Sequence, residues 1–142
     1  MLVETILQTK GTAVYTLPAT STLTEAVALL NAHNIGAIVI AGPDGTIAGI
    51  LSERDIVRQL GKDPIGALAQ PISNSMTSAV VTCERTTEIA EVMERMTRRR
   101  IRHMPVVEDN KLIGIISIGD VVKRKIEEIE HEAGALRDYI AS

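Results

Sequence analysis

The chain contains an internal repeat, and this repeat constrains its fold more than any other feature. At an offset of 66 positions, Leu23-Thr24-Glu25-Ala26 aligns with Ile89-Ala90-Glu91-Val92. Beyond a predicted hairpin turn the offset becomes 65, and Gly49-Ile50-Leu51-Ser52 aligns with Gly114-Ile115-Ile116-Ser117. A turn is where a repeat tolerates the loss of one residue. A unit of about 60 residues is marginally stable alone, so we expect the two copies to pack sheet to sheet about a pseudo-two-fold axis.

Each copy carries the pattern of a β-α-β-β-α unit, which predicts a mixed α/β (α+β) fold. Apolar residues recur at helical spacing in 23–34 and 89–100. Short extended stretches precede these helices at 13–16 and 79–82. Hairpins follow them at 37–40 with 47–51 and at 104–107 with 112–116. We expect a first unit over residues 1–65, a second over 66–126 and a C-terminal helical extension over 127–142. Residues 61–66, with Pro71 and Asn74 beyond, form the predicted linker.

Composition argues against several classes of protein. The net charge is −3 with acids and bases mixed, which disfavours a dedicated nucleic-acid or anionic-membrane binder. The basic run at 98–103 has no aromatic residues nearby for base stacking. No apolar run approaches the ~20 residues that span a bilayer, and no secretory signal is evident. We therefore expect a cytoplasmic protein that binds neither nucleic acid nor membrane.

The sequence offers no convincing catalytic or metal-binding constellation. His33, His103 and His131 lack metal-ligand spacing with one another and with Cys83. The glycines near residue 45 belong to a hairpin rather than to a phosphate-binding loop. We therefore expect neither enzymatic activity nor a metal site.

The motif Ser-x-x-Asp occurs once in each copy, at Ser52/Asp55 and at Ser117/Asp120. Before an apolar run this pattern is a helix-capping signature, because the serine oxygen accepts an early helix N–H. A helix start also carries free N–H donors and a partial positive charge, so it can hold an anion. A structural cap and a ligand site are compatible interpretations of the same residues.

The ordered set of motifs resembles the tandem cystathionine-β-synthase (CBS) domain pair, also called a Bateman module. The resemblance rests on 49–55 (GILSERD), 114–120 (GIISIGD), 101–107 (IRHMPVV) and 75–77 (SMT), and it covers almost the whole chain. It implies a regulatory module that binds an adenosine-containing ligand between its repeats. The ligand would be AMP, ADP, ATP, NAD(H) or S-adenosylmethionine, and Mg²⁺ would enter only with ATP.

The resemblance also implies roles for individual residues. Asp55 and Asp120 would bind the ribose hydroxyls, Ser52 and Ser117 would face phosphate or ribose, and Ile50 and Ile115 would line the adenine slot. One expected cleft combines Asp120, Ser117, Arg102, His103, Ser21, Ala26 and Ile38. The other combines Asp55, Ser52, Arg54, Thr87 and Val92. We expect the Asp120 cleft to be the principal site, because Arg102 and His103 would give it more positive charge.

The C-terminal segment has a second pattern. Its apolar residues are spaced by alternating steps of four and three, at Val122, Ile126, Ile129, Ala133, Leu136 and Ile140. This is a heptad seam, and it predicts either docking within the chain or a homodimer contact. The alternative to the ligand-binding function is accordingly a structural or scaffolding dimer with no physiological nucleotide. In either case a regulated protein would be a separate partner.

Overall fold

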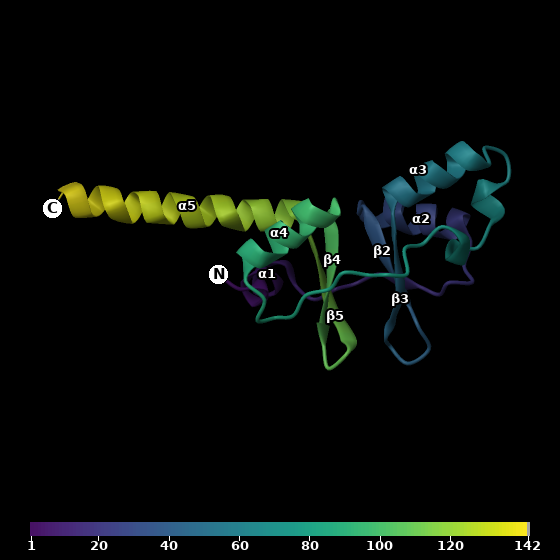
Figure 1. Ribbon diagram of the computed structural model, residues 1–142, viewed down its shortest axis with the longest axis horizontal. Helices are drawn as coiled ribbons and strands as arrows, with labels where there is room; N and C mark the ends of the chain where they lie inside the picture. Colours follow the sequence, from purple (N-terminus) through teal and green to yellow (C-terminus); the bar gives the residue numbers. More distant parts are fainter. Residues whose placement is uncertain (142) are drawn as a thin grey trace.

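The computed structural model describes residues 1–141 and contains two copies of one mixed α/β unit, as the sequence predicted (Figure 1). The first copy comprises β1 (Thr16–Leu17), α2 (Leu23–His33), β2 (Ala37–Ala41), β3 (Ile47–Ser52) and α3 (Glu53–Lys62). Strand β1 pairs parallel with β2, and β2 pairs antiparallel with β3. Helix α2 ends one residue before the predicted end, because Asn34 adopts a left-handed conformation with φ of 51°.

The second copy repeats this arrangement. It comprises α4 (Ile89–Arg99), β4 (His103–Glu108), β5 (Lys111–Ser117) and α5 (Ile118–Ala141), and β4 pairs antiparallel with β5. Arg100 ends α4 in the same left-handed conformation, with φ of 54°. The place of β1 is taken by a single parallel bridge between Cys83 and Val106. The repeated Ser-x-x-Asp motif therefore marks the same strand-to-helix junction in both copies.

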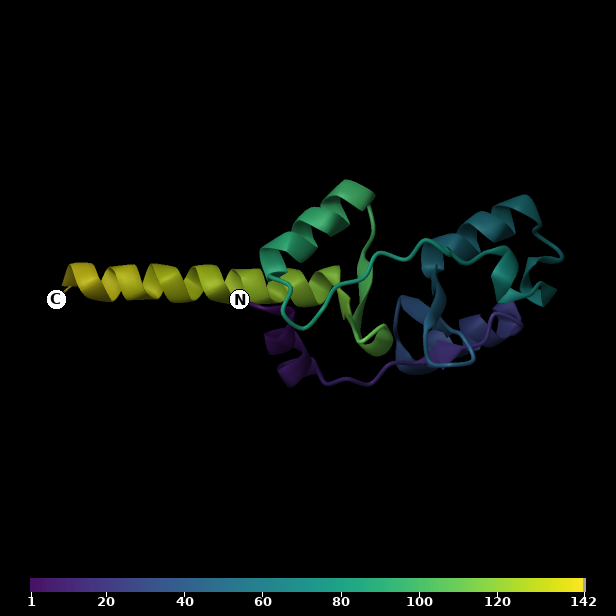
Figure 2. The same cartoon turned by 60° about the horizontal axis from the view of Figure 1, so that its bottom comes forward.

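Two short 3₁₀ helices, η1 (Ala67–Ala69) and η2 (Ile72–Asn74), occupy the connection between the copies. We expected Gly61 and Lys62 to belong to the linker, but they form the last turn of α3. The residues after η2 cross back to the first copy, where Ile50 and Thr77 exchange backbone hydrogen bonds of 2.9 Å. In Figures 1 and 2 the two copies lie side by side with this connection running across them.

The first helix, α1 (Val3–Lys10), was not predicted, and it packs on the second copy rather than the first. Val3, Ile6 and Leu7 are buried in the core that also contains Ile89 and Ile116. The amide of Val3 donates to the carbonyl of Thr87 at 2.9 Å. The N-terminal segment thus ties the beginning of the chain to its second repeat.

The core is divided into two aliphatic clusters, one in each copy. Leu23, Ile38 and Leu51 are fully buried in the first, and Ile89, Met104 and Ile116 are almost fully buried in the second. Within residues 1–141 no helix is long and apolar enough to cross a membrane.

The repeat-related glycines Gly49 and Gly114 give a matched test of this packing. A Cβ at Gly49 would lie 2.9 Å from the carbonyl oxygen of Thr77 and 2.7 Å from the Met76 sulfur, whereas at Gly114 it would meet the end of the Leu7 side chain at 2.8 Å. A side-chain end can rotate away more easily than backbone can move. We expect Gly49→Ala to lower the free energy of unfolding by about 1–3 kcal/mol and Gly114→Ala to lower it by less. Urea denaturation of both variants measures this, and equal losses would contradict the account.

Candidate functional site

The junction between β3 and α3 is held by reciprocal hydrogen bonds between Ser52 and Asp55. Asp55 Oδ2 accepts from the Ser52 amide at 2.9 Å and from the Ser52 hydroxyl at 3.1 Å, while the Asp55 amide donates to Ser52 Oγ at 3.4 Å. This capping box confirms the predicted helix start. The bonds use one carboxylate oxygen, and Oδ1 accepts no hydrogen bond within residues 1–141. Asp55 therefore keeps an acceptor for another molecule.

The equivalent junction before α5 has the same cap and an additional partner. Asp120 Oδ2 accepts from the Ser117 amide at 2.8 Å and from Lys10 Nζ at 2.7 Å. The same ammonium group donates to the carbonyl of Ile115 at 3.0 Å. Burial of the carboxyl raises the pKa of Asp120, but the hydrogen bonds from Lys10 and Ser117 outweigh burial and hold it below its usual value. The carboxylate of the second copy is therefore already paired with a cation of the protein.

A cleft with a volume of about 790 Å³ lies between the two copies. One wall comes from β3 and the first turns of α3, with Ser52, Arg54, Asp55 and Arg58. The rest of the lining comes from the extended segment 77–81, which begins beside β3 at Thr77, and from the residues that join α4 to β4. Its lining residues are Gly36, Ile50, Ser52, Glu53, Arg54, Asp55, Val57, Arg58, Thr77, Ala79, Val80, Val81, Arg99, Arg100, Ile101, Arg102 and His103.

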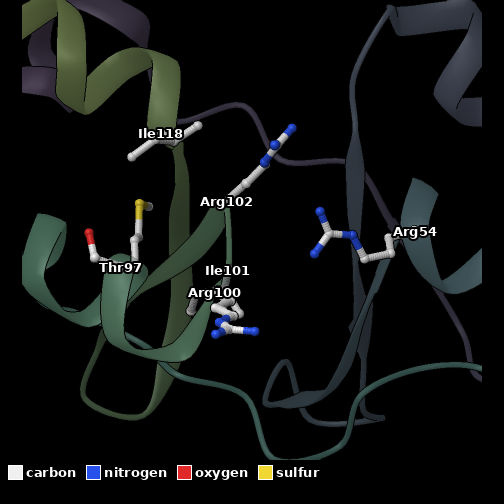
Figure 3. A pocket seen from close by; sticks show the side chains of 7 residues that line it. Arg54, Thr97, Arg100, Ile101, Arg102 and Ile118 are labelled. Atoms are coloured by element: carbon white, nitrogen blue, oxygen red, sulfur yellow. The ribbon is translucent and has the colours of Figure 1, made fainter.

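Arginine side chains from both copies surround an adjoining pocket of about 370 Å³. Figure 3 shows Arg54 extending from the first copy toward Arg100 and Arg102 of the second. None of these arginines forms an ion pair with any residue in the described chain, 1–141. By contrast, a glutamate pairs with each of three other arginines, Arg85, Arg95 and Arg98. The cleft thus ends in a group of unneutralised positive charges suited to an anion.

His103 stands at the contact between the copies. A Cβ on Gly36 would approach its ring to 3.2 Å, so the absence of a side chain at residue 36 leaves room for the imidazole. Burial lowers the pKa of His103, and the charge of Lys10 lowers it further, while Glu53 and Asp120 act in the opposite direction. His103 is therefore neutral near pH 7, so one ring nitrogen can donate a hydrogen bond and the other can accept one.

The structure brings together Ile50, Ser52, Arg54 and Asp55 from the first copy, as one predicted cleft required. It also places Arg102 and His103 in this cleft, whereas we expected them in the cleft of Asp120. The start of β4 lies at the contact between the copies: Arg102 and His103 line this cleft, and His103 also pairs with Ser117 at the junction that carries Asp120.

Several predicted wall residues belong to the core instead. Ala26 and Ile38 are fully buried in the first cluster, and Val92 is fully buried in the second. Ser21 is buried, and its carbonyl accepts from the amide of Ile72 at 2.7 Å. Thr87 stabilises a turn by accepting from the Glu84 amide at 2.9 Å. The apolar spacing of α2 and α4 indicates the buried face of each helix, and this face carries Ala26 and Val92.

We did not predict from the sequence that the segment 77–81, Arg99 and Arg100 would line the cleft. Two signals bore on this segment: the alignment of Ala79-Val80 with Ala13-Val14, which marked it as extended, and the motif 75–77 (SMT), which ends at Thr77. Whether such a segment borders a cleft or covers a core depends on how the copies face each other.

Comparison with known proteins agrees with this architecture. Residues 7–62 and 70–127 each match the CBS domain family. The chain is 35% identical over 123 residues to the mitochondrial CBS domain-containing protein CBSX3 of Arabidopsis thaliana, covering 84% of this chain and 60% of that protein. The chain therefore spans less than two thirds of the length of that relative.

Solved structures share the whole fold. The CBS-domain containing protein ATU1752 of Agrobacterium tumefaciens is 42% identical, with a TM-score of 0.85 over 88% of this chain and 99% of that one. The CBS domain pair of protein MJ0100, in complex with 5-methylthioadenosine and S-adenosylmethionine, is 26% identical, with a TM-score of 0.81 over 90% and 98%. The CBS domain protein PAE2072 of Pyrobaculum aerophilum, complexed with AMP, is 28% identical, with a TM-score of 0.75 over 84% and 89%.

The ion pair between Lys10 and Asp120 generates a pH prediction. A carboxyl whose folded-state pKa is lowered stabilises the protein at neutral pH, and this contribution is lost as the pH falls through that pKa. We expect Lys10→Met to lower the free energy of unfolding by up to about 1 kcal/mol at pH 7, since the pair is partly exposed. The difference from wild type should shrink well below pH 3.8, the ordinary aspartate value, where only the hydrogen bond from Lys10 to the Ile115 carbonyl remains.

Chemical denaturation at several pH values measures this difference. Lys62→Met is the matched control, because Lys62 is exposed and makes no ion pair within the described residues. A deficit in Lys10→Met that stays constant down to pH 2.5 would show that the charge of Asp120 is not involved.

Proposed function

Since the chain belongs to the CBS domain family and carries two copies of the domain, we propose that it is a regulatory module that binds an adenosine-containing ligand in the cleft of Asp55. The observation that carries the proposal is that one cleft brings together a carboxylate oxygen and arginines that have no hydrogen-bond or ion-pair partner among residues 1–141. Solved neighbours of the same fold contain AMP, or 5-methylthioadenosine and S-adenosylmethionine. The cleft of this chain has the groups that such ligands require.

Each part of the ligand has a complement in the cleft. Vicinal ribose hydroxyls can donate to Asp55, whose orientation is set by the cap with Ser52. Adenine can lie against the aliphatic side chains of Ile50, Val80 and Val81, with backbone groups of the extended segment available for its polar edge. Aliphatic walls replace aromatic stacking, because the chain has neither Phe nor Trp.

The charge of the cleft favours adenosine ligands that carry phosphate. Arg54, Arg100 and Arg102 form a shared positive field, and the start of α3 adds the partial positive charge of a helix N-terminus. A sulfonium cation gains nothing from such surroundings, whereas AMP, ADP, ATP and NAD(H) do. We therefore place S-adenosylmethionine below the anionic nucleotides for this chain, with Mg²⁺ relevant only to ATP.

The two clefts are unequal, and we propose that the Asp55 cleft is the principal site. At the other junction Asp120 is already paired with Lys10 through Oδ2, so its charge is balanced before a ligand binds. This reverses the preference drawn from sequence, because both Arg102 and His103 line the first cleft.

A ligand in this cleft would contact both copies at once and so stabilise one arrangement of the two. We propose that this stabilisation is the signal, that it is transmitted to a separate protein partner, and that the chain does not transform the ligand. Ligand at ~100 times its dissociation constant adds about 2.7 kcal/mol of stability.

Substitution of the two aspartates tests the choice of cleft. We expect Asp55→Asn to weaken AMP or ATP binding about tenfold to a hundredfold, the loss of a hydrogen bond to a charged acceptor. The matched variant Asp120→Asn should bind within about threefold of wild type, since less than ~1 kcal/mol separates them. Isothermal titration calorimetry on folded protein separates binding from stability, and the opposite ranking would move the site to the second cleft.

The arginine pocket generates a second prediction about ligand charge. We expect Arg102→Met to weaken ATP binding at least tenfold, about 1.4 kcal/mol or more, and to leave adenosine binding unchanged. Arg85→Met is the control, because Arg85 is paired with Glu108 away from the cleft. Equal losses for ATP and adenosine would show that Arg102 supports the fold rather than a phosphate. No binding of any adenosine compound at millimolar concentration would favour the scaffolding alternative.

A further inference from the structure

Helix α5 (Ile118–Ala141) continues well beyond the body of the protein, as Figure 1 shows. Its first turns pack on the second copy through the fully buried Val121 and through Arg124, which hydrogen-bonds to Thr9 of α1. The residues from 130 to 141 are exposed except for Gly134, which is half-buried. A free helical segment of about 12 residues is marginal in water, and Gly134 weakens it further because glycine is a poor helix former. We therefore expect another surface to stabilise this part of α5.

The exposed apolar side chains of α5 form one continuous seam. They occupy the a and d positions of a heptad, with Val122, Ile129 and Leu136 at d and Ile126, Ala133 and Ile140 at a. Ile129 is 54% exposed, Leu136 61% and Ile140 74%. The seam is separate from the face that carries Val121 and Arg124, so the protein's own core does not cover it. Its spacing matches the surface that another helix of the same type buries.

The charged residues beside the seam identify the occupant and its direction. In a parallel pair, each g residue faces the e residue of the following heptad in the other helix, five positions later, and such pairs set orientation. This rule joins Lys125 to Glu130 of the second copy and Glu132 to Arg137 of the second copy. Both pairs are attractive, and two-fold symmetry makes each of them twice. Glu130, Glu132 and Arg137 make no ion pair within residues 1–141, and the pair of Lys125 with Glu128 is a loose 3.6 Å.

An antiparallel pair of the same helices is disfavoured by charge. Full overlap of the seam would place Val122 opposite Ile140 of the other copy. Glu130 and Glu132 would then each face the same residue of the other copy. Lys123 would lie near Arg137 of the other copy. Like charges at these flanking positions oppose that orientation.

We propose that α5 pairs with α5 of a second copy as a parallel two-stranded coiled coil, joining two ligand-binding modules at the same end. The small Ala133 at the central a position lets the two helices approach closely. The seam is shorter than three heptads, but its first turns are already folded on the module, which removes the cost of helix nucleation. This inference does not depend on the nucleotide proposal, because no cleft residue takes part.

Charge exchange in the full chain tests the pairing. Sedimentation velocity over a range of concentrations should show a wild-type dimer. Glu132→Arg alone and Arg137→Glu alone should each raise the dimer dissociation constant at least tenfold, and the double variant should restore it. A mixture of the two single variants should form a heterodimer, since each then supplies the charge the other lacks. The control Asp138→Arg makes the same charge change at an exposed position away from the seam and should leave the dimer intact.

Disulfide capture tests the direction. Leu136→Cys should form an inter-chain disulfide in a parallel pair, where the two residues face each other. In the antiparallel pair they would be about 15 Å apart at 1.5 Å per residue, beyond the reach of a disulfide. The native Cys83 does not compete, because it is buried and burial raises the pKa of its thiol to about 12.

Several results would overturn the proposal. They are a wild-type monomer at all concentrations, a trimer, a dimer indifferent to both charge reversals, and a dimer that Leu136→Cys fails to cross-link. Circular dichroism and thermal melting of each variant verify that the module itself remains folded.

Discussion

The reciprocal hydrogen bonds between Ser52 and Asp55 fix the end of β3 and the start of α3 in one rigid junction. Everything in the proposed site depends on where this junction points. It directs the free oxygen of Asp55, the first amides of α3 and the Arg54 side chain toward the neighbouring copy. The junction can do so because β3 is anchored from both sides, by β2 along one edge and by the Ile50–Thr77 hydrogen bonds along the other.

Duplication explains why a cleft exists, and small departures from the repeat explain why its two versions differ. Gly36 in the first copy occupies the repeat position of Arg102 in the second. Because Gly36 has no side chain, the ring of His103 from the second copy can pack against it. Arg54 is matched by Gly119, which leaves the second junction without that cation. Lys10, from a helix outside the repeat, supplies a charge there instead and pairs with Asp120. The same backbone motif thus holds a carboxylate with no ion pair within residues 1–141 in one cleft and a carboxylate paired with a lysine in the other.

Much of the fold could be predicted from the sequence, because helix and strand periodicity are local signals. The buried stripe of α2, the two hairpins and both caps followed from the spacing of residues such as Leu23 and Ser52. Helix α1 escaped prediction because Val3, Ile6 and Leu7 are buried in a cluster whose other members lie more than 70 positions away. The same limit applies to the site. Ala26 and Ile38 were assigned to a ligand wall although both are buried in the core, and Arg102 and His103 were assigned to the Asp120 cleft although both line the Asp55 cleft as well. These assignments depend on how the two copies face each other, which no local pattern contains.

The central claim is that a phosphate-bearing adenosine ligand binds in the Asp55 cleft. Methyl NMR of isoleucine- and valine-labelled protein titrated with AMP tests it most directly, because Ile50 and Ile115 occupy equivalent positions in the two copies. The account predicts saturable shifts of the Ile50, Val80 and Val81 methyl signals, with Ile115 little changed. Shifts confined to Ile115, or none at millimolar AMP in protein shown to be free of bound nucleotide, would contradict it.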